Sequence, residues 1–284
     1  LRDMRVRTGD LVIAADAAGA VRAKAQTFRL TADGGNIDVH GTVDASGSRG
    51  GNILLAAKNN LTLHAGALLD AHANDANQAG GEVNLQTAAL SGFIQLNNQL
   101  IDVHGGTSGG NVSLRAARNE TNDDVNLNNT DLTSGNAANS LNVSAGAKVT
   151  VEAFKTYVAP ASLTTGNAAT TTTVYKNEAT AFSNNVNAIK TRLGMLGDSN
   201  LHLTPGVELT SSGDLTLAKN WDLADWRFND GNGGVTEAGI LTFRAAGNLN
   251  FGTVAGTITT TASLMDGFTT ANNVITSSTG VFPT

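Results

Sequence analysis

One short sequence occurs twice in this chain, as GGNILLAAKN at 50–59 and as GGNVSLRAARN at 109–119. The segments IDVHGTVDASGSRGG (37–51) and IDVHGGTSGG (101–110) precede the two copies, and the residues that the shorter one lacks fall in a stretch rich in Gly, Ser, Asp and Thr. Loops tolerate such deletions far better than strands do. We therefore predict that IDVHG and GGN(I/V)xL are strands joined by a turn of variable length.

Alternation within these strands predicts which side chains are buried. Successive side chains of a strand point to opposite faces, so the aliphatic residues after each Gly pair share one face. Ile53, Val83 and Val112 are predicted to point inward, and Gly50, Gly80 and Gly109 to lie at turns.

A second motif occurs at 61–70 (LTLHAGALLD), 141–150 (LNVSAGAKVT) and 201–210 (LHLTPGVELT). Each copy alternates, and the glycines at 66, 146 and 206 are predicted to form a bend, because glycine accepts a positive φ without Cβ strain. The offsets between the copies fit a basic period of roughly 20 residues, at the short end of the range for repeat proteins.

Periods of this size indicate stacked structural repeats. The repeats show almost no helical periodicity, which excludes an α/β solenoid, and they are too short for the roughly 40-residue blade of a β-propeller. The predicted fold class is all-β, a right-handed parallel β-helix, since parallel crossovers are right-handed by default. The 32 glycines and 3 prolines fit this fold, because turns need glycine and stacked strands need their N–H groups.

Three segments are predicted along the chain: coils over 1–151, an insertion over 152–198, and coils over 199–284 that continue to an irregular end. The insertion is predicted to hold an amphipathic helix at about 180–194, outside the coil stack. Its apolar residues fall on one helical face, and Gly194 and Gly197 are its predicted stop signals; the face comprises Phe182, Val186, Ile189, Leu193 and Leu196.

Charge and hydropathy exclude several functions. The net charge is −6, and the 18 Lys and Arg residues form no basic stripe, so nucleic acid is not an expected partner. No apolar run approaches the roughly 18–20 residues of a membrane span. The absence of cysteine is compatible with the cytosol and equally with export in an unfolded state.

The repeats resemble those of the filamentous-haemagglutinin-like exoproteins of Gram-negative bacteria. The resemblance rests on GGNIDVHGTVDASG, GGNVSLRAARN, LHLTPGVELTSSGDLTLAKNWDLADWRF and GILTFRAAGNLNF, and it covers most of residues 30–255. It implies two-partner secretion through an outer-membrane partner, a β-helical shaft on the outer cell surface, and adhesion to cells, surfaces or biofilm matrix. The family's amino-terminal secretion domain with its Asn-Pro-Asn signatures is not found, so the chain is expected to be an internal or carboxy-terminal part of the shaft. The receptor, a glycan or a protein, is not specified, and self-association is a further expectation.

An enzyme is the main alternative, because carbohydrate lyases and hydrolases also use β-helices and need converging carboxylates. Asp38 and Asp102 are predicted to be equivalent in register, as turn partners rather than as catalysts. The five histidines, His40, His64, His72, His104 and His202, are predicted to be surface residues, with His40 and His104 in the same slot about three coils apart. No catalytic, cofactor-binding or metal-binding residue is predicted. A pure structural spacer is the third possibility.

The stretch KNWDLADWRFNDGNGG, residues 219–234, contains both tryptophans of the chain. Trp221, Trp226, Arg227 and Phe228 are the candidate interaction surface, because Trp and Arg are over-represented at binding hot spots. The favoured interpretation is structural: the tryptophans fill a wide coil or pack under the helix. In the functional alternative, at least Trp226 and Arg227 are exposed.

Overall fold

The computed structural model describes residues 1–17, 23–97, 99–127, 141–163, 170–218, 221–223, 226–231, 236–251 and 264–265. The chain forms two compact units. Unit 1 comprises 1–153, 185–204 and 230–235, and unit 2 comprises 154–184, 205–229 and 236–284. Both consist mostly of strands in parallel sheets, so the all-β prediction is confirmed.

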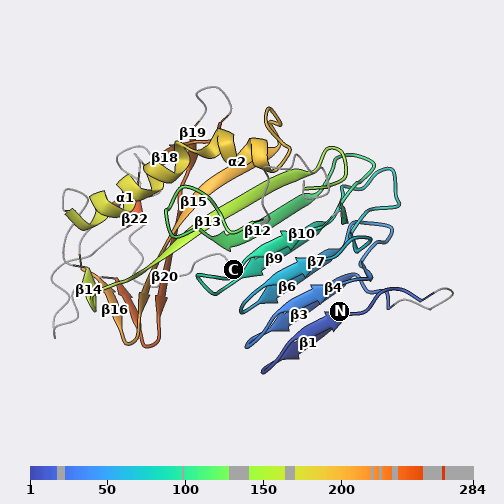
Figure 1. Ribbon diagram of the computed structural model, residues 1–284, viewed down its shortest axis with the longest axis horizontal. Coiled ribbons are helices and arrows are strands. Elements are labelled where there is room, and N and C mark those ends of the chain that lie inside the picture. The colour runs from blue at the N-terminus through green and yellow to red at the C-terminus, as the bar shows by residue number, and fades with distance from the viewer. Residues whose placement is uncertain are drawn as a thin grey trace. The chain divides into compact units, whose positions relative to one another are not determined.

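Three parallel sheets build unit 1, and the strands of the largest lie side by side in chain order (Figure 1). This sheet contains β1 (Arg2–Val6), β3 (Thr27–Ala32), β6 (Asn52–Ala57), β9 (Glu82–Thr87), β12 (Asn111–Ala117) and the first part of β13 (Lys148–Val158). The second sheet contains β2 (Leu11–Ile13), β4 (Ile37–Val39), β7 (Leu61–Leu63) and β10 (Ile94–Leu96). The third contains β5 (Thr42–Asp44), β8 (Leu68–Asp70) and β11 (Leu100–Asp102). The chain therefore visits the three sheets in turn and then begins again.

The core of unit 1 consists of columns of aliphatic side chains, one residue from each pass of the chain. In the large sheet Ile53 pairs with Val83, and Val83 with Val112, and all three are 0% exposed. The predicted inward orientation of these residues is confirmed. The smaller sheets contribute similar columns: Ile37, Leu61 and Ile94 in the second, and Val43, Leu69 and Ile101 in the third.

The length of one pass follows from the register of the large sheet, in which Phe28, Ile53, Val83 and Val112 are successive partners. Each step between these positions is longer than the period expected from the motif offsets, so the predicted period is wrong. The two GGN copies do lie in the same sheet, but a further pass, GGEVNLQT at 80–87, lies between them. The strands keep their register while the segments between them vary in length.

The glycine pairs before β6, β9 and β12 allow successive passes to approach closely. Gly50, Gly80 and Gly109 precede their strands without a positive φ. A Cβ at Gly80 would lie 1.7 Å from the carbonyl oxygen of Val103, and one at Gly109 would lie 2.2 Å from that of Gly146. These positions are therefore restricted to glycine by backbone contact rather than by φ.

Replacing Gly80 by Ala is expected to lower the stability of unit 1 by about 3 kcal/mol, because backbone must shift to admit the methyl group. Gly47→Ala is the matched control, since a Cβ there meets its nearest atoms at 3.4 Å, an ordinary contact. Thermal unfolding followed by circular dichroism measures both. Equal midpoints for the two variants would show that the passes can separate at no cost.

Two of the three predicted glycine bends are found. Gly66 and Gly146 have φ values of +85° and +78°, which a residue with a side chain rarely adopts. Gly206 instead lies inside the continuous strand β15 (Leu201–Ser211) and pairs with Ile240. The predicted bend at 206 is wrong because this strand runs on through the proline and glycine to Ser211.

Unit 2 has its own parallel sheets and one antiparallel pair. The end of β13 and the second part of β15 belong to it, and β15 pairs with β20 (Ile240–Ala245). β16 (Leu215–Leu217) lies between β14 (Ser162–Leu163) and β21 (Leu249–Phe251). β17 (Trp221–Asp222) pairs with β22 (Leu264–Met265), and β18 (Arg227–Asn229) pairs antiparallel with β19 (Thr236–Ala238). The predicted irregular end lies outside the described residues beyond Phe251, apart from β22.

The predicted helix at 180–194 is present, but it is two helices. α1 (Thr170–Ser183) belongs to unit 2 and α2 (Val186–Arg192) to unit 1, with Asn184 and Asn185 in a turn between them. The predicted stop signal at Gly194 is confirmed, since this glycine has a positive φ directly after the C-cap residue Leu193. Gly197 also has a positive φ, but it lies in a separate turn after the helix has ended. Of the predicted apolar face, Leu196 alone is exposed, at 58%, because the second helix has already ended.

Each helix is attached to its own unit by polar contacts. In unit 2, Tyr157 donates to Glu178 of α1 at 2.6 Å, and Lys155 pairs with the same carboxylate. In unit 1, Arg192 at the end of α2 donates to Asp124 at 2.7 Å and to the carbonyl oxygen of Leu127. The predicted insertion, 152–198, thus divides between the two units.

Candidate functional site: a column of aspartates and histidines

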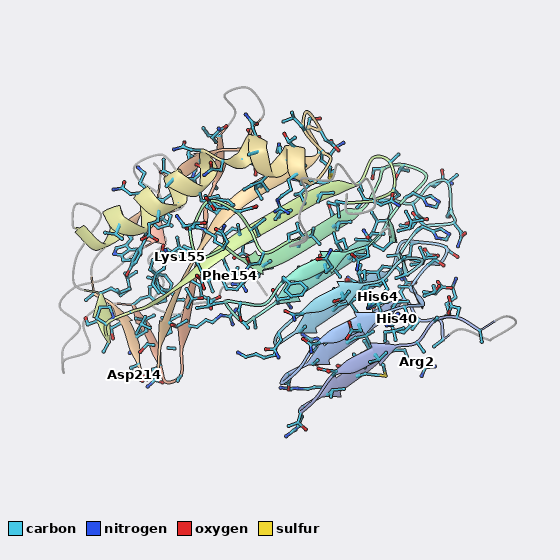
Figure 2. All side chains as sticks on the ribbon, viewed as in Figure 1. Arg2, His40, His64, Phe154, Lys155 and Asp214 are labelled. Atoms are coloured by element: carbon cyan, nitrogen blue, oxygen red, sulfur yellow. The ribbon has the colours of Figure 1, made fainter. Side chains whose placement is uncertain are left out.

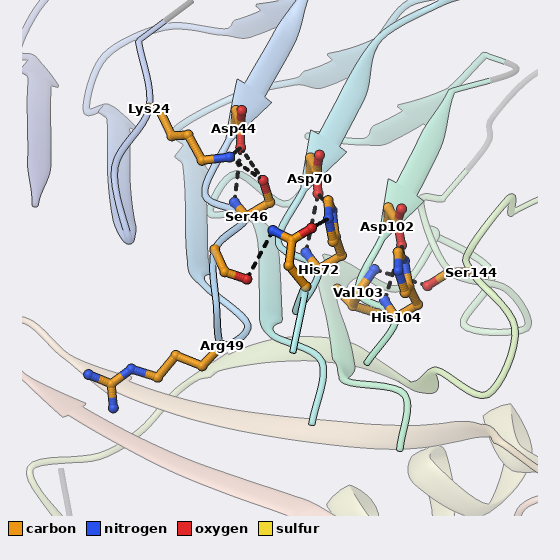
Figure 3. A network of polar contacts seen from close by, with 12 residues as sticks. Lys24, Asp44, Ser46, Arg49, Asp70, His72, Asp102, Val103, His104 and Ser144 are labelled. Atoms are coloured by element: carbon orange, nitrogen blue, oxygen red, sulfur yellow. Dashed lines mark hydrogen bonds and ion pairs between the residues drawn. The ribbon is translucent and has the colours of Figure 1, made fainter. Parts of the chain in front are cut away.

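The third sheet of unit 1 ends each of its strands with an aspartate. Asp44 closes β5, Asp70 closes β8 and Asp102 closes β11, and the three are register partners from pass to pass. Their side chains are 20%, 15% and 20% exposed. The parallel register therefore stacks three half-buried carboxylates into one column (Figure 3).

Each aspartate binds the residue two positions further along the chain. The carboxylate of Asp44 accepts hydrogen bonds from the backbone N–H and the hydroxyl of Ser46, at 3.0 and 2.7 Å. His72 binds Asp70 in the same way, through its backbone N–H and through Nδ1 at 2.5 Å. His104 binds Asp102 through its backbone N–H at 3.0 Å and through Nδ1 at 2.7 Å. This local turn returns the chain toward the next strand of the large sheet.

The two imidazoles stack on each other. The ring centroids of His72 and His104 are 4.6 Å apart with an interplanar angle of 6°, which matches the spacing of one pass. Since an ionised carboxylate can only accept, Nδ1 of each ring donates its proton to the aspartate. Each ring is thereby fixed in orientation, with Nε2 as its outward nitrogen.

Asn74 faces the outward nitrogen of His72. Its Oδ1 lies 3.0 Å from Nε2, while its amide nitrogen donates to the carbonyl oxygen of Gly47 at 3.1 Å. Burial would lower the pKa of His72, but the hydrogen bonds with Asn74 and Asp70 and the charges of Asp70 and Asp102 raise it above its ordinary value. Burial would raise the pKa of Asp102, but the hydrogen bonds with His104 outweigh this effect and lower the pKa below its ordinary value.

The two ends of the aspartate column have no histidine: Lys24 lies at one end and Ser144 at the other. At the first pass the Lys24 ammonium lies 3.2 Å from Asp44 and donates to the Ser46 hydroxyl at 2.6 Å. Burial would raise the pKa of Asp44, but the bonds to Ser46 and Lys24 lower it. At the other end Ser144 accepts a hydrogen bond from the backbone N–H of Val103 at 2.9 Å. The histidines therefore occupy the two middle passes.

A second stacked pair lies on the second sheet. His40 and His64 have ring centroids 3.8 Å apart at 11°, and Figure 2 shows them as neighbours. Nε2 of His64 lies 3.3 Å from Asp38. The predicted equivalence of the IDVHG copies is therefore wrong: Asp38 belongs to β4 and Asp102 to β11, so His40 and His104 lie on different sheets. His40 instead stacks on the histidine of the next pass.

The candidate interaction surface is mostly buried in unit 2. Trp221 is 0%, Trp226 4% and Phe228 3% exposed, and they share a core with Tyr175 and Ala179 of α1. The favoured structural interpretation is therefore confirmed, because both tryptophan rings fill this core, and the functional alternative with an exposed Trp226 is wrong. Arg227 is half-buried and donates to the backbone oxygen of Trp226 at 3.2 Å. The residues around them at 219–220, 224–225 and 232–235 lie outside the described part.

The column could act on protons or bind a cation. His72, Asp102 and His104 offer ligand atoms that all lie within 4.8 Å of one another. The prediction placed these histidines on the surface as unrelated residues and overlooked Asp44 and Asp70. The signal was present in the sequence, since VDAS, LDAH and IDVH each precede a Gly pair at the same corner of the fold.

Comparison with protein-family models, with curated proteins and with solved structures finds no match for this chain. Within the described residues, no helix has the length and apolar character needed to cross a membrane.

Proposed function

We propose that this chain is a non-catalytic segment of a secreted, cell-surface adhesin, and that unit 1 is a right-handed parallel β-helix forming part of its shaft. The observation that carries the proposal is the regular parallel register of unit 1, in which three sheets share stacked aliphatic columns over successive passes. Stacked repeats of this kind grow by addition of passes and present long regular surfaces. The repeat sequences also resemble those of filamentous-haemagglutinin-like exoproteins.

Two features of unit 1, its aspartate column and an apolar cavity, support a binding role more than a catalytic one. Each carboxylate of the aspartate column is already occupied by the N–H groups of its own turn. An open cavity of about 330 Å³ in the same unit is lined mainly by alanine and larger apolar residues, among them Met4, Ile13 and Phe28. Asp16 also lines the cavity and accepts a hydrogen bond from the Thr42 hydroxyl at 2.6 Å, which is not the converging pair of carboxylates that glycoside hydrolysis needs.

A direct adhesion assay tests the proposal. Beads coated with the purified chain are expected to bind cultured epithelial cells or bacterial cells saturably, and excess soluble chain should compete. Beads coated with Val112→Asp, whose buried carboxylate should unfold unit 1, provide the matched control. Absence of binding in every cell type and on a glycan array would favour a spacer instead.

A carbohydrate-active enzyme is the second candidate, favoured by the aspartate column alone. Neighbouring carboxylates beside imidazoles can serve as acid and base. Incubation with a panel of acidic and neutral polysaccharides, with detection of new reducing ends, separates the two functions. Turnover that disappears in Asp102→Asn would contradict the adhesin proposal.

A further inference from the structure

The turn that ends the third sheet does not require histidine. At the first of the three aspartates, Ser46 satisfies the carboxylate of Asp44 with one backbone N–H and one hydroxyl. His72 and His104 make the equivalent two bonds and add an imidazole ring beyond them. The rings therefore supply something that the turn itself does not need.

The aspartates orient these rings in the way that metal-binding histidines are oriented. A ligating histidine usually donates its other ring N–H to a carboxylate, which fixes the tautomer and increases the basicity of the ligating nitrogen. Asp70 and Asp102 stand in that position toward Nδ1 of His72 and of His104. Both Nε2 lone pairs are thereby directed outward.

Two electron-rich atoms face each other beside His72. With Nδ1 donating to Asp70, Nε2 of a neutral ring has a lone pair, and Asn74 Oδ1 also has only lone pairs to offer at 3.0 Å. The Asn74 amide is held in this orientation, because its nitrogen donates to Gly47. The pair is stabilised only by a positive charge between its members, either a proton or a metal ion.

The distance between Nε2 of His72 and Oδ1 of Asn74 indicates which kind of ion fits. With metal–ligand bonds of about 2.1 Å, ligand atoms 3.0 Å apart subtend about 90° at the ion, the angle of octahedral or square-planar coordination. The His104 ring lies one pass away and its side chain is 52% exposed, so the ring can tilt its Nε2 toward the same ion while Nδ1 keeps its hydrogen bond with Asp102. Imidazole nitrogens with an amide oxygen suit Ni²⁺ and Cu²⁺ rather than Mg²⁺ or Ca²⁺.

We propose that His72, Asn74 and His104 form a binding site for a divalent transition-metal ion of the Ni²⁺ or Cu²⁺ type, with Asp70 and Asp102 as the orienting carboxylates. The two carboxylates also supply negative charge next to the ion. The ammonium group of Lys24 pairs with Asp44 at the far end of the column.

Calorimetric titration of the whole chain with Ni²⁺ tests the site, and Ser46 suggests the variants. His72→Ser and His104→Ser retain a hydroxyl donor for their aspartates, as Ser46 does for Asp44, so the turn is preserved. Each is expected to raise the Kd for Ni²⁺ at least tenfold, with an unchanged thermal midpoint in the absence of metal. His40→Ser is the matched control, because the His40–His64 pair is also stacked but has a single aspartate. Unchanged affinity in His104→Ser, or equal losses in His40→Ser, would overturn the proposal.

A measurement on the wild-type chain keeps the test independent of variant folding. Electron paramagnetic resonance of the wild-type chain with one equivalent of Cu²⁺ is expected to show coupling to two imidazole nitrogens; coupling to one or none would refute the site. Asp102→Asn is expected to raise the Kd about tenfold, the usual effect of losing an orienting carboxylate. Asp38→Asn, beside the other histidine pair, should leave the Kd unchanged.

Discussion

Replacement of Val112 by Asp should lower the stability of unit 1 by about 4 kcal/mol, one of the largest effects a single residue can have. Val112 is 0% exposed and stacks on Val83 of the preceding pass. An aspartate at this position would be stacked on Val83 among the aliphatic columns of the core. The carboxyl group would either stay ionised at high cost or take up a proton.

Two neighbouring variants separate burial of charge from loss of packing. Val112→Ala removes two methyl groups and should cost about 2 kcal/mol. Ser113→Asp adds the same charge on the opposite, partly exposed face and should cost less than about 1 kcal/mol. Hydrogen exchange in β9 and β12 reports the stability of this unit separately from that of the rest of the chain. Protection in Val112→Asp equal to that of the parent would disprove the inward assignment.

Truncation of Trp221 to Ala is expected to destabilise unit 2 by about 4 kcal/mol, since it removes the largest fully buried side chain of the chain's described part. Its ring lies 5.9 Å from that of Phe243, and both belong to the core that includes α1. The same core includes Leu217 of β16 and Phe251 of β21, which are register partners. Their amide hydrogens should exchange faster, while those of β6 and β9 should not change.

Arg227→Ala is the control variant for Trp221→Ala. This side chain is half-buried beside Trp226, and its removal should cost less than about 1 kcal/mol. Adhesion measured with Trp221→Ala would then fall only as far as unit 2 unfolds. Loss of adhesion in Arg227→Ala at an unchanged melting temperature would instead show that this region contacts a receptor directly.

Alternation of polar and apolar residues was sufficient to predict the core. Ile53, Val83 and Val112 are buried because a period of two places them on one face of a strand, whatever the strand's neighbours are. The second motif, with the free φ of its glycine, predicted the bends at 66 and 146, because such bends depend on the local backbone conformation. It failed at Gly206, where a copy of the motif continues as a straight strand.

Pairing between passes could not be predicted in the same way. IDVHG at 37 and at 101 have the same local pattern, yet they belong to β4 and β11 because the segments between strands differ in length. Register depends on the length of each pass, and the step from Phe28 to Ile53 is shorter than the step from Ile53 to Val83. Since His72 and His104 meet only through this register, the column of aspartates and histidines was not visible from either motif alone.

The helical region was predicted in type but not in its bounds. The apolar face from Phe182 to Leu193 identified it, whereas the threonines that open α1 have low helix propensity and concealed its beginning. The break at Asn184 and Asn185 also follows no strong sequence signal, because the apolar spacing continues across it. Gly194 marks the end of α2 as predicted, whereas the break between the helices coincides with the division between the two units.

The parallel register of unit 1 has a mechanical consequence. Its hydrogen bonds between passes run along the stacking direction, so a pull in that direction loads the outermost pass first, and inner passes keep their contacts until it detaches. Each detached pass releases roughly 90 Å of extended chain, at about 3.3–3.6 Å for every residue between one register partner and the next. In the proposed adhesin shaft, such passes would lengthen in steps under load and dissipate energy at each step, so that an attachment would yield to shear without being torn away.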